Sequence, residues 1–181
     1  MKDAAVRFEH VKKYFMKSSG LFGHTTLKAV DDISFEIKKG EILAVVGESG
    51  CGKSTLAKML CKIHDVTEGK IYVDGKEITG HMSKQEMQEF RSNVQMIFQD
   101  PFGSLNPAHK VSYIVGRAVE IHNPHMNKKE VKQRVIELFE TVGLTPAVDF
   151  MEKHPNQLSG GQRQRIVIAR ALAVEPSIMV A

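Results

Sequence analysis

Residues 42–55 read Ile42-Leu43-Ala44-Val45-Val46-Gly47-Glu48-Ser49-Gly50-Cys51-Gly52-Lys53-Ser54-Thr55, and this stretch decides the fold class of the 181-residue chain. Residues 47–54 fit the pattern G-x-x-x-x-G-K-S/T, a glycine-rich loop that binds nucleotide phosphates. The apolar run 42–46 before the loop is typical of a strand buried on both faces of a parallel sheet. A helix is expected over residues 55–62. This order of strand, loop and helix is the context that the motif requires.

The residue types of the loop suit phosphate chemistry. Glycines permit backbone angles that are closed to other residues, so successive N–H groups can turn toward phosphate oxygens. The start of the helix adds the positive end of its dipole. Lys53 is expected to place its charge on the β- and γ-phosphates, and Ser54 to offer a hydroxyl to Mg²⁺. The predicted contacts come from Gly47, Glu48, Ser49, Gly50, Cys51, Gly52, Lys53, Ser54 and Thr55.

A second motif, Leu158-Ser159-Gly160-Gly161-Gln162, opens a helix expected over residues 159–174. A serine hydroxyl, free N–H groups and the helix dipole form a second anion site. Taken alone, the same residues also fit an ordinary helix cap followed by flexible glycines.

Together, the two motifs resemble the phosphate loop and the signature of ABC-transporter ATPases, and nearly the whole chain resembles that nucleotide-binding domain. The resemblance implies an α/β P-loop fold with a mixed β core, a small antiparallel β subdomain and a helical subdomain. It places a β-rich nucleotide-binding core at 1–100 and the helical subdomain, which meets the membrane partner, at 101–157. The signature helix and the start of the Walker B strand then occupy 158–181.

The resemblance also implies site residues. Gln99 matches the glutamine that contacts Mg²⁺ and the attacking water, and would act in catalysis with Lys53. Phe15 or Tyr14 matches the aromatic that stacks on adenine; Phe15 fits the family spacing better, and an aromatic packed on the β subdomain is the alternative. In this family the signature of one domain closes over ATP held by another, which implies a head-to-tail dimer, homomeric or heteromeric.

The branch of the family is indicated by three longer stretches, residues 47–56, residues 98–107 and residues 154–165. All three resemble the corresponding stretches of importers of peptides and nickel. This implies an ATPase, a hydrolase and translocase, that couples ATP binding and hydrolysis to solute uptake. Its partners would be membrane permease subunits and, indirectly, a solute-binding protein. It would lie on the cytoplasmic face of the membrane.

The last residues, Ile178-Met179-Val180-Ala181, resemble the apolar part of the Walker B strand. The Asp that orders Mg²⁺ and the Glu that acts as general base would come next. We therefore expect a chain truncated at this point, one that binds ATP weakly without turning it over.

The composition of the chain and the spacing of its motifs limit the other functions that it could have. The balance of 42% hydrophobic and 25% charged residues is that of a globular domain. The chain has a net charge of +4 and its basic residues are scattered along the sequence, so no nucleic acid partner is expected. Three other functions stay open: a soluble ABC ATPase of repair or translation, a P-loop GTPase or kinase, and a binding-only fragment. Residues 127–130 nearly match a guanine-reading motif, but their final Glu and their place before an apolar helix predict a capping box.

Local patterns predict further elements. Ile33, Phe35 and Ile37 alternate with polar residues, as in a half-buried strand. Asp74-Gly75 favours a type I′ hairpin turn. Residues 83–86 predict a second capping box, and Gly143 is expected to end the helix that begins near residue 127. Short strands are expected at 94–98 and 177–181.

Overall fold

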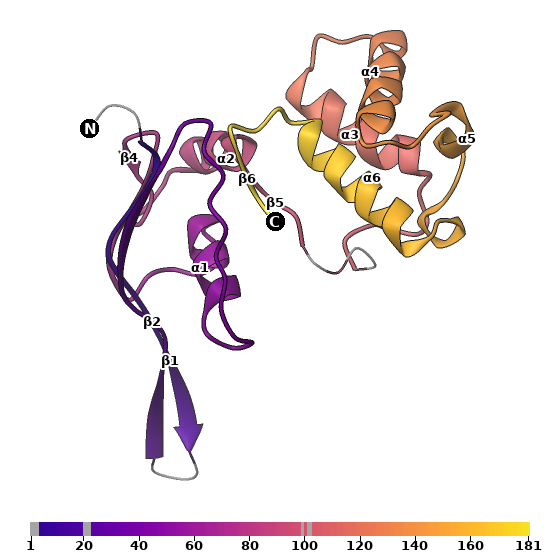
Figure 1. The fold of residues 1–181 in the computed structure, drawn as a ribbon. Helices are drawn as coiled ribbons and strands as arrows, with labels where there is room; N and C mark the ends of the chain where they lie inside the picture. Colours follow the sequence, from indigo (N-terminus) through magenta and orange to yellow (C-terminus); the bar gives the residue numbers. More distant parts are fainter. Residues whose placement is uncertain (1–3, 20–22, 99, 101–102) are drawn as a thin grey trace. The chain divides into compact units, whose positions relative to one another are not determined.

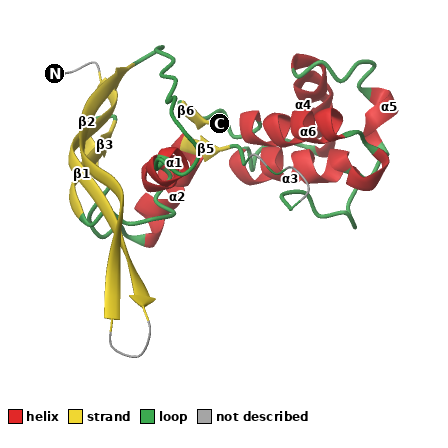
Figure 2. Cartoon of the chain, turned by 60° about the horizontal axis from the view of Figure 1, so that its bottom comes forward, coloured by secondary structure: helices red, strands yellow, loops and turns green. Residues whose placement is uncertain are grey.

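The computed structural model describes residues 4–19, 23–98, 100 and 103–181. The chain forms two compact units, unit 1 (Met1–Met87) and unit 2 (Gln88–Ala181). Helix α2 (Lys84–Asn93) runs across the boundary between them. Figure 1 shows the path of the chain and Figure 2 its helices and strands. The domain boundaries expected at residues 100 and 157 stay a prediction.

Unit 1 contains a four-stranded antiparallel sheet in the order β2-β1-β3-β4. Its strands are β1 (Ala4–Ser19), β2 (Gly23–Lys38), β3 (Glu68–Val73) and β4 (Lys76–Glu77). The predicted alternation in β2 is confirmed, because its apolar side chains are partly buried and their neighbours are exposed. The predicted hairpin is confirmed as well: Asp74 and Gly75 have φ values of 47° and 78°, as a type I′ turn requires.

One face of this sheet is a small apolar core. Its buried members are Val6, Phe8, Val11, Val30, Ile71 and Val73. The rings of Phe8 and Phe35 stack across β1 and β2 with centroids 4.6 Å apart. This packing fixes the register of β1 and β2 around Phe8 and Phe35, because a slip of one residue there would expose the buried side chains.

Helix α1 (Lys53–Leu60) begins two residues earlier than predicted, and Leu56, Met59 and Leu60 are buried. Helix α2 begins at the predicted capping box. The N–H of Ser83 donates to Glu86 Oε2 at 2.9 Å, and the N–H of Glu86 donates to Ser83 Oγ at 3.2 Å. The backbone hydrogen bond from Ser83, together with the ammonium of Lys76, lowers the pKa of Glu86 to about 2.

The strand predicted over residues 42–46 is absent, and this prediction was wrong. The segment has no assigned strand pairing, and its side chains are exposed, Ile42 to 96% and Val46 to 90%. A strand is defined by the hydrogen bonds of a neighbour. Among the described residues, the paired strands are β1–β4 in one sheet and β5 with β6 in another, and none of them pairs with this segment.

Unit 2 is mainly helical. It contains α3 (Val111–His122), α4 (Lys128–Thr141), α5 (Val148–Met151), the 3₁₀ turn Pro155–Gln157 and α6 (Gly160–Leu172). Strands β5 (Val94–Met96) and β6 (Ile178–Val180) pair in parallel, and both were predicted. Both expected ends of α4 are confirmed. Asn127 and Glu130 form its capping box, and Gly143 follows its C-terminus with φ 73°.

The core of unit 2 lies between α3, α4 and α6. Its fully buried side chains include Val111, Val115, Val119, Val135, Phe139 and Ile166. Helix α4 contributes Val131, Val135, Leu138 and Phe139 to this core, and all four are buried. Within the described residues, no helix has both the length and the apolar character needed to cross a bilayer.

Candidate nucleotide site and signature helix

The glycine-rich loop of unit 1 has the backbone that phosphate binding requires. Gly50 and Gly52 adopt positive φ values of 85° and 97°, and the N–H of Cys51 donates to the carbonyl of Glu48 at 3.3 Å. The first intrahelical bond of α1 joins the N–H of Leu56 to the carbonyl of Gly52 at 2.9 Å. The N–H groups of residues 53–55 therefore have no intrahelical acceptor, and the positive end of the helix is open to a ligand.

Glycine is needed at position 52 for a second reason. A Cβ there would lie 2.1 Å from the carbonyl oxygen of Ala29, on strand β2. The loop thus approaches the sheet more closely than any side chain would allow. Gly50 differs, because nothing lies within 4 Å of its Cβ position. The sheet therefore supports the loop at Gly52 and leaves its tip at Gly50 open.

Lys53 turns back over the loop. Its Nζ donates to the carbonyls of Gly47 and Glu48 at 2.8 and 2.7 Å. A cation, a set of backbone N–H groups and the Ser54 hydroxyl thus gather at the start of α1. These donors fit the oxygens of a phosphate chain. No group of three His, Cys, Asp or Glu side chains that could hold a metal exists in the part of the chain that is described.

The two cysteines differ in environment. Cys51 is exposed in the loop, and its Sγ lies 3.7 Å from Lys53 Nζ. Cys61 is partly buried just after α1, and burial raises the pKa of its thiol to about 11. Because the thiolate is the reactive form of cysteine, Cys61 is the less reactive of the two.

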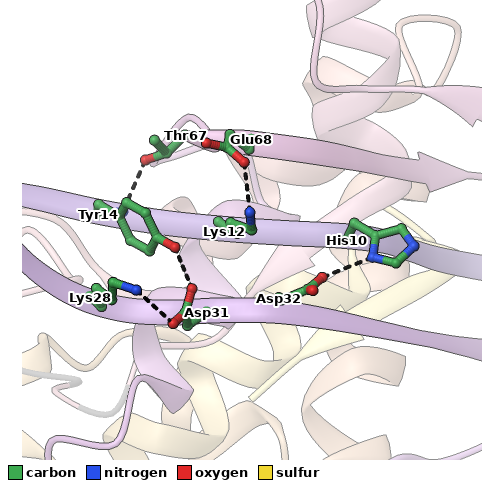
Figure 3. Close-up of polar contacts among 8 residues, drawn as sticks. All are labelled: His10, Lys12, Tyr14, Lys28, Asp31, Asp32, Thr67 and Glu68. Atoms are coloured by element: carbon green, nitrogen blue, oxygen red, sulfur yellow. Dashed lines mark hydrogen bonds and ion pairs between the residues drawn. The ribbon is translucent and has the colours of Figure 1, made fainter.

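The two candidate aromatics on β1 have different surroundings. The hydroxyl of Tyr14 donates to Asp31 Oδ1, and Asp31 Oδ2 accepts from Lys28 Nζ at 3.1 Å (Figure 3). These contacts lower the pKa of the Asp31 carboxyl, the bond from Tyr14 first and that from Lys28 next. Phe15 has an edge-to-face contact with His64, with ring centroids 5.5 Å apart. The ring of Tyr14 is thus tied into the sheet by its hydroxyl, and Phe15 is the better candidate for stacking on a base.

The signature residues lie at the start of α6 in unit 2. Ser159 and Gln162 form a reciprocal capping box: Ser159 Oγ accepts from the Gln162 N–H at 3.2 Å, and Gln162 Oε1 accepts from the Ser159 N–H at 2.9 Å. Leu158 is buried, whereas Gly160 and Gly161 are exposed, with nothing within 4 Å of their Cβ positions. The ordinary helix cap, which was the alternative interpretation of this motif, is thus present. The residues that follow it leave the start of the helix exposed.

Two arginines of α6, neither of them predicted from the sequence, hold the signature helix in place. Arg165 Nη1 donates to the carbonyls of Val142 and Gly143 at 2.7 and 3.0 Å, at the C-terminal end of α4. A cation is favourable there because the carbonyls at a helix C-terminus carry partial negative charge. Arg170 Nη1 donates to the carbonyl of Ser104 at 2.7 Å, and burial lowers the pKa of this guanidinium.

Gln99, the glutamine expected to contact Mg²⁺ and water, lies outside the described residues, as do Pro101 and Phe102 of the same stretch. Its role stays a prediction. The phosphate loop and the two candidate aromatic residues belong to unit 1, and the signature belongs to unit 2.

Comparison with known proteins decides the family. A family model described as "ABC transporter" matches residues 30–181. This chain belongs to the ABC transporter family. It is 45% identical to the oligopeptide transport ATP-binding protein OppF of Bacillus subtilis, over 100% of this chain and 57% of that protein. It is 41% identical to the di/tripeptide transport ATP-binding protein DppF of Pseudomonas aeruginosa, over 93% of this chain and 51% of that protein.

Solved structures support the expected fold of this ABC family chain. The chain is similar to the ATP-binding cassette MJ0796 in a dimeric, post-hydrolysis structure bound to ADP and Pi. The two sequences are 30% identical, and the TM-score is 0.81. The match covers 96% of this chain and 72% of that one. The predicted α/β fold of an ABC ATPase is thereby confirmed. The chain spans about half the length of the curated relatives it matches.

Proposed function

We propose that this chain is the nucleotide-binding part of an ATPase subunit that powers peptide import through a membrane permease. The observation that carries the proposal is the loop 47–54, which gathers the Lys53 ammonium and open N–H groups at the start of α1. Both curated relatives described above are named as ATP-binding proteins of peptide transport. On this basis the protein works at the cytoplasmic face of the membrane, beside its permease.

Each site residue has a proposed role. The loop N–H groups and Lys53 bind the phosphate oxygens of ATP and offset their negative charge, and Ser54 holds Mg²⁺ through its hydroxyl. When bound, Mg²⁺ neutralises charge on the β- and γ-phosphate oxygens. Phe15 stacks on the adenine, and Gln99 orients the water that attacks the γ-phosphorus. Catalysis of this kind depends mainly on positioning and on electrostatic stabilisation.

We further propose that two such subunits associate head to tail. In that arrangement the exposed start of α6, with Ser159, Gly160 and Gly161, covers the nucleotide held by the phosphate loop of the other subunit. Arg165 and Arg170 are positioning residues for this surface, because they fasten α6 to the end of α4 and to the segment at Ser104. The dimeric structure of the MJ0796 cassette described above supports this assembly.

The test is a calorimetric titration of the intact protein with Mg-ATP and Mg-GTP, followed by isolation of the protein from membranes. We expect ATP to bind more tightly than GTP and the protein to copurify with a permease that takes up peptides. Preference for GTP would point to the GTPase alternative. Binding of ATP without any membrane partner would point to an ABC ATPase of repair or translation.

Cysteine labelling gives a second test of the loop. A maleimide is expected to modify Cys51 faster than Cys61, since Cys51 is exposed and the pKa of Cys61 is raised to about 11. Mg-ATP is expected to slow labelling of Cys51, because the bound phosphates would cover the loop. Mass spectrometry of digested protein measures both rates. Equal labelling of Cys51 with and without nucleotide would show that Cys51 does not line the nucleotide site.

A further inference from the structure

The segment that leaves α1 is bound back onto the helix. After Leu60 the chain turns through Lys62, which has a positive φ of 53°. The N–H groups of Ile63 and His64 both donate to the carbonyl of Lys58, at 2.8 and 3.2 Å. Residues 61–64 therefore keep a fixed position relative to the helix whose other end begins at the phosphate loop.

The same segment is then fastened to β1 by Thr67. Its N–H donates to the carbonyl of Lys12 at 2.7 Å, and its Oγ1 accepts from the N–H of Tyr14 at 2.9 Å. Figure 3 shows the second of these bonds beside the ion pair of Lys12 with Glu68, which has an Nζ–Oε2 distance of 2.8 Å. Thr67 precedes the first residue of β3, so its hydroxyl adds one hydrogen bond beyond the β1–β3 ladder.

Phe15 follows directly on the residue that Thr67 holds. Its ring contacts His64 at 5.5 Å between centroids, with the ring planes at 78°, and Lys13 Nζ lies 5.0 Å from the Phe15 centroid. On the β2 side, the Tyr14 hydroxyl is anchored to Asp31. The backbone just before Phe15 is thus held from both neighbouring strands, and its ring touches the segment that leaves α1.

We propose that Thr67 is a positioning residue of the nucleotide site: it fixes the distance between the phosphate loop and the base-stacking Phe15, and His64 sets the orientation of the Phe15 ring. This inference rests on the proposed function. One nucleotide carries both base and phosphates, so its two contact points must keep a constant separation. Helix α1 and the hydrogen bonds of Thr67 connect the phosphate loop rigidly to Phe15. Because the site is already ordered before the nucleotide binds, binding does not have to meet the entropic cost of ordering the site.

The test uses Mg-ATP and Mg-tripolyphosphate, which has phosphates and no base. The intact protein carrying Thr67→Val is expected to bind ATP more weakly by up to about tenfold, because the cost of ordering Phe15 on binding cannot exceed the strength of the one hydrogen bond that orders it in the free protein. It is expected to bind tripolyphosphate as the wild type does. Thr67→Ser, which keeps the hydroxyl, is expected to restore ATP affinity. His64→Ala is expected to weaken ATP binding in the same selective way, and His64→Phe to restore it. Thr79→Val is a matched control in the same unit, expected to leave both affinities unchanged.

The pair of probes separates the possible outcomes. Unchanged ATP affinity in Thr67→Val would overturn the inference. Equal losses for ATP and tripolyphosphate in that variant would also overturn it, because they would show a general effect on the loop or the fold. A wild-type protein that binds neither probe would overturn the proposed function, and this inference with it.

Discussion

Replacing Lys53 by alanine is expected to lower the affinity for Mg-ATP at least tenfold. The ammonium lies over the loop, 2.8 and 2.7 Å from the carbonyls of Gly47 and Glu48. A hydrogen bond to a charged group is worth about 1.5–3 kcal/mol, which corresponds to roughly a 10- to 150-fold change in Kd. The variant also loses the two bonds that hold the loop carbonyls, so the loop becomes less ordered before any ligand binds. Isothermal titration calorimetry with the intact protein measures the change.

Lys58 offers a matched control in the same helix. Like Lys53 it is a partly buried lysine of α1, so Lys58→Ala removes an equal charge away from the loop and is expected to leave affinity nearly unchanged. Lys53→Arg is expected to bind ATP weakly although its charge is kept, because a planar guanidinium does not replace a compact ammonium inside a tight loop. Wild-type affinity in Lys53→Ala, with an unchanged circular dichroism spectrum, would refute the assignment of the phosphate site.

Features encoded by neighbouring residues were predicted well. The capping boxes at Ser83 and Asn127 and the turn at Asp74-Gly75 all formed as expected. In each of them, side chains and backbone groups within four residues satisfy one another, so the local sequence holds the whole cause. The phosphate loop is local only in part: Lys53 contacts carbonyls within the loop, whereas Gly52 is required by the close approach to Ala29 of β2.

The apolar run 42–46 shows where such reasoning ends. Its composition is that of a buried strand, yet burial and pairing are properties of its neighbours. In the described chain these residues meet no pairing strand and stay exposed. Composition indicates that the segment suits a sheet, and only the tertiary structure says whether a sheet is there to receive it.

The supports of the site could not be found by pattern for a similar reason. Arg165 contacts a carbonyl 23 residues away, and the Thr67 hydroxyl accepts from an N–H 53 residues away. Neither has a recognisable motif, since an arginine on a helix and a threonine before a strand are common in any protein. Spacing also could not fully separate Tyr14 from Phe15. The hydrogen bond of Tyr14 to Asp31 distinguishes them, and it appears only when β1 lies beside β2.

Replacing Gly52 by alanine is expected to destabilise unit 1 strongly, by about 3 kcal/mol or more. Two costs combine. The φ of 97° is unfavourable for any residue with a side chain, and the new Cβ would lie 2.1 Å from the Ala29 carbonyl oxygen. That oxygen belongs to the backbone of β2, so it cannot move aside as a flexible side chain could. Either the loop must leave the sheet, or the strand must shift against its apolar core.

Gly50→Ala separates the two costs, because Gly50 has a similar φ of 85° and open space at its Cβ position. This variant is expected to lose only about 1–2 kcal/mol, the cost of the left-handed conformation alone. Urea denaturation followed by circular dichroism gives the free energy of unfolding of each variant, and ATP titration at low temperature shows whether the folded fraction still binds. Similar losses of stability in the two variants would mean that the close approach to Ala29 contributes nothing. In that case the sheet would not be the support that holds the phosphate loop in its binding conformation.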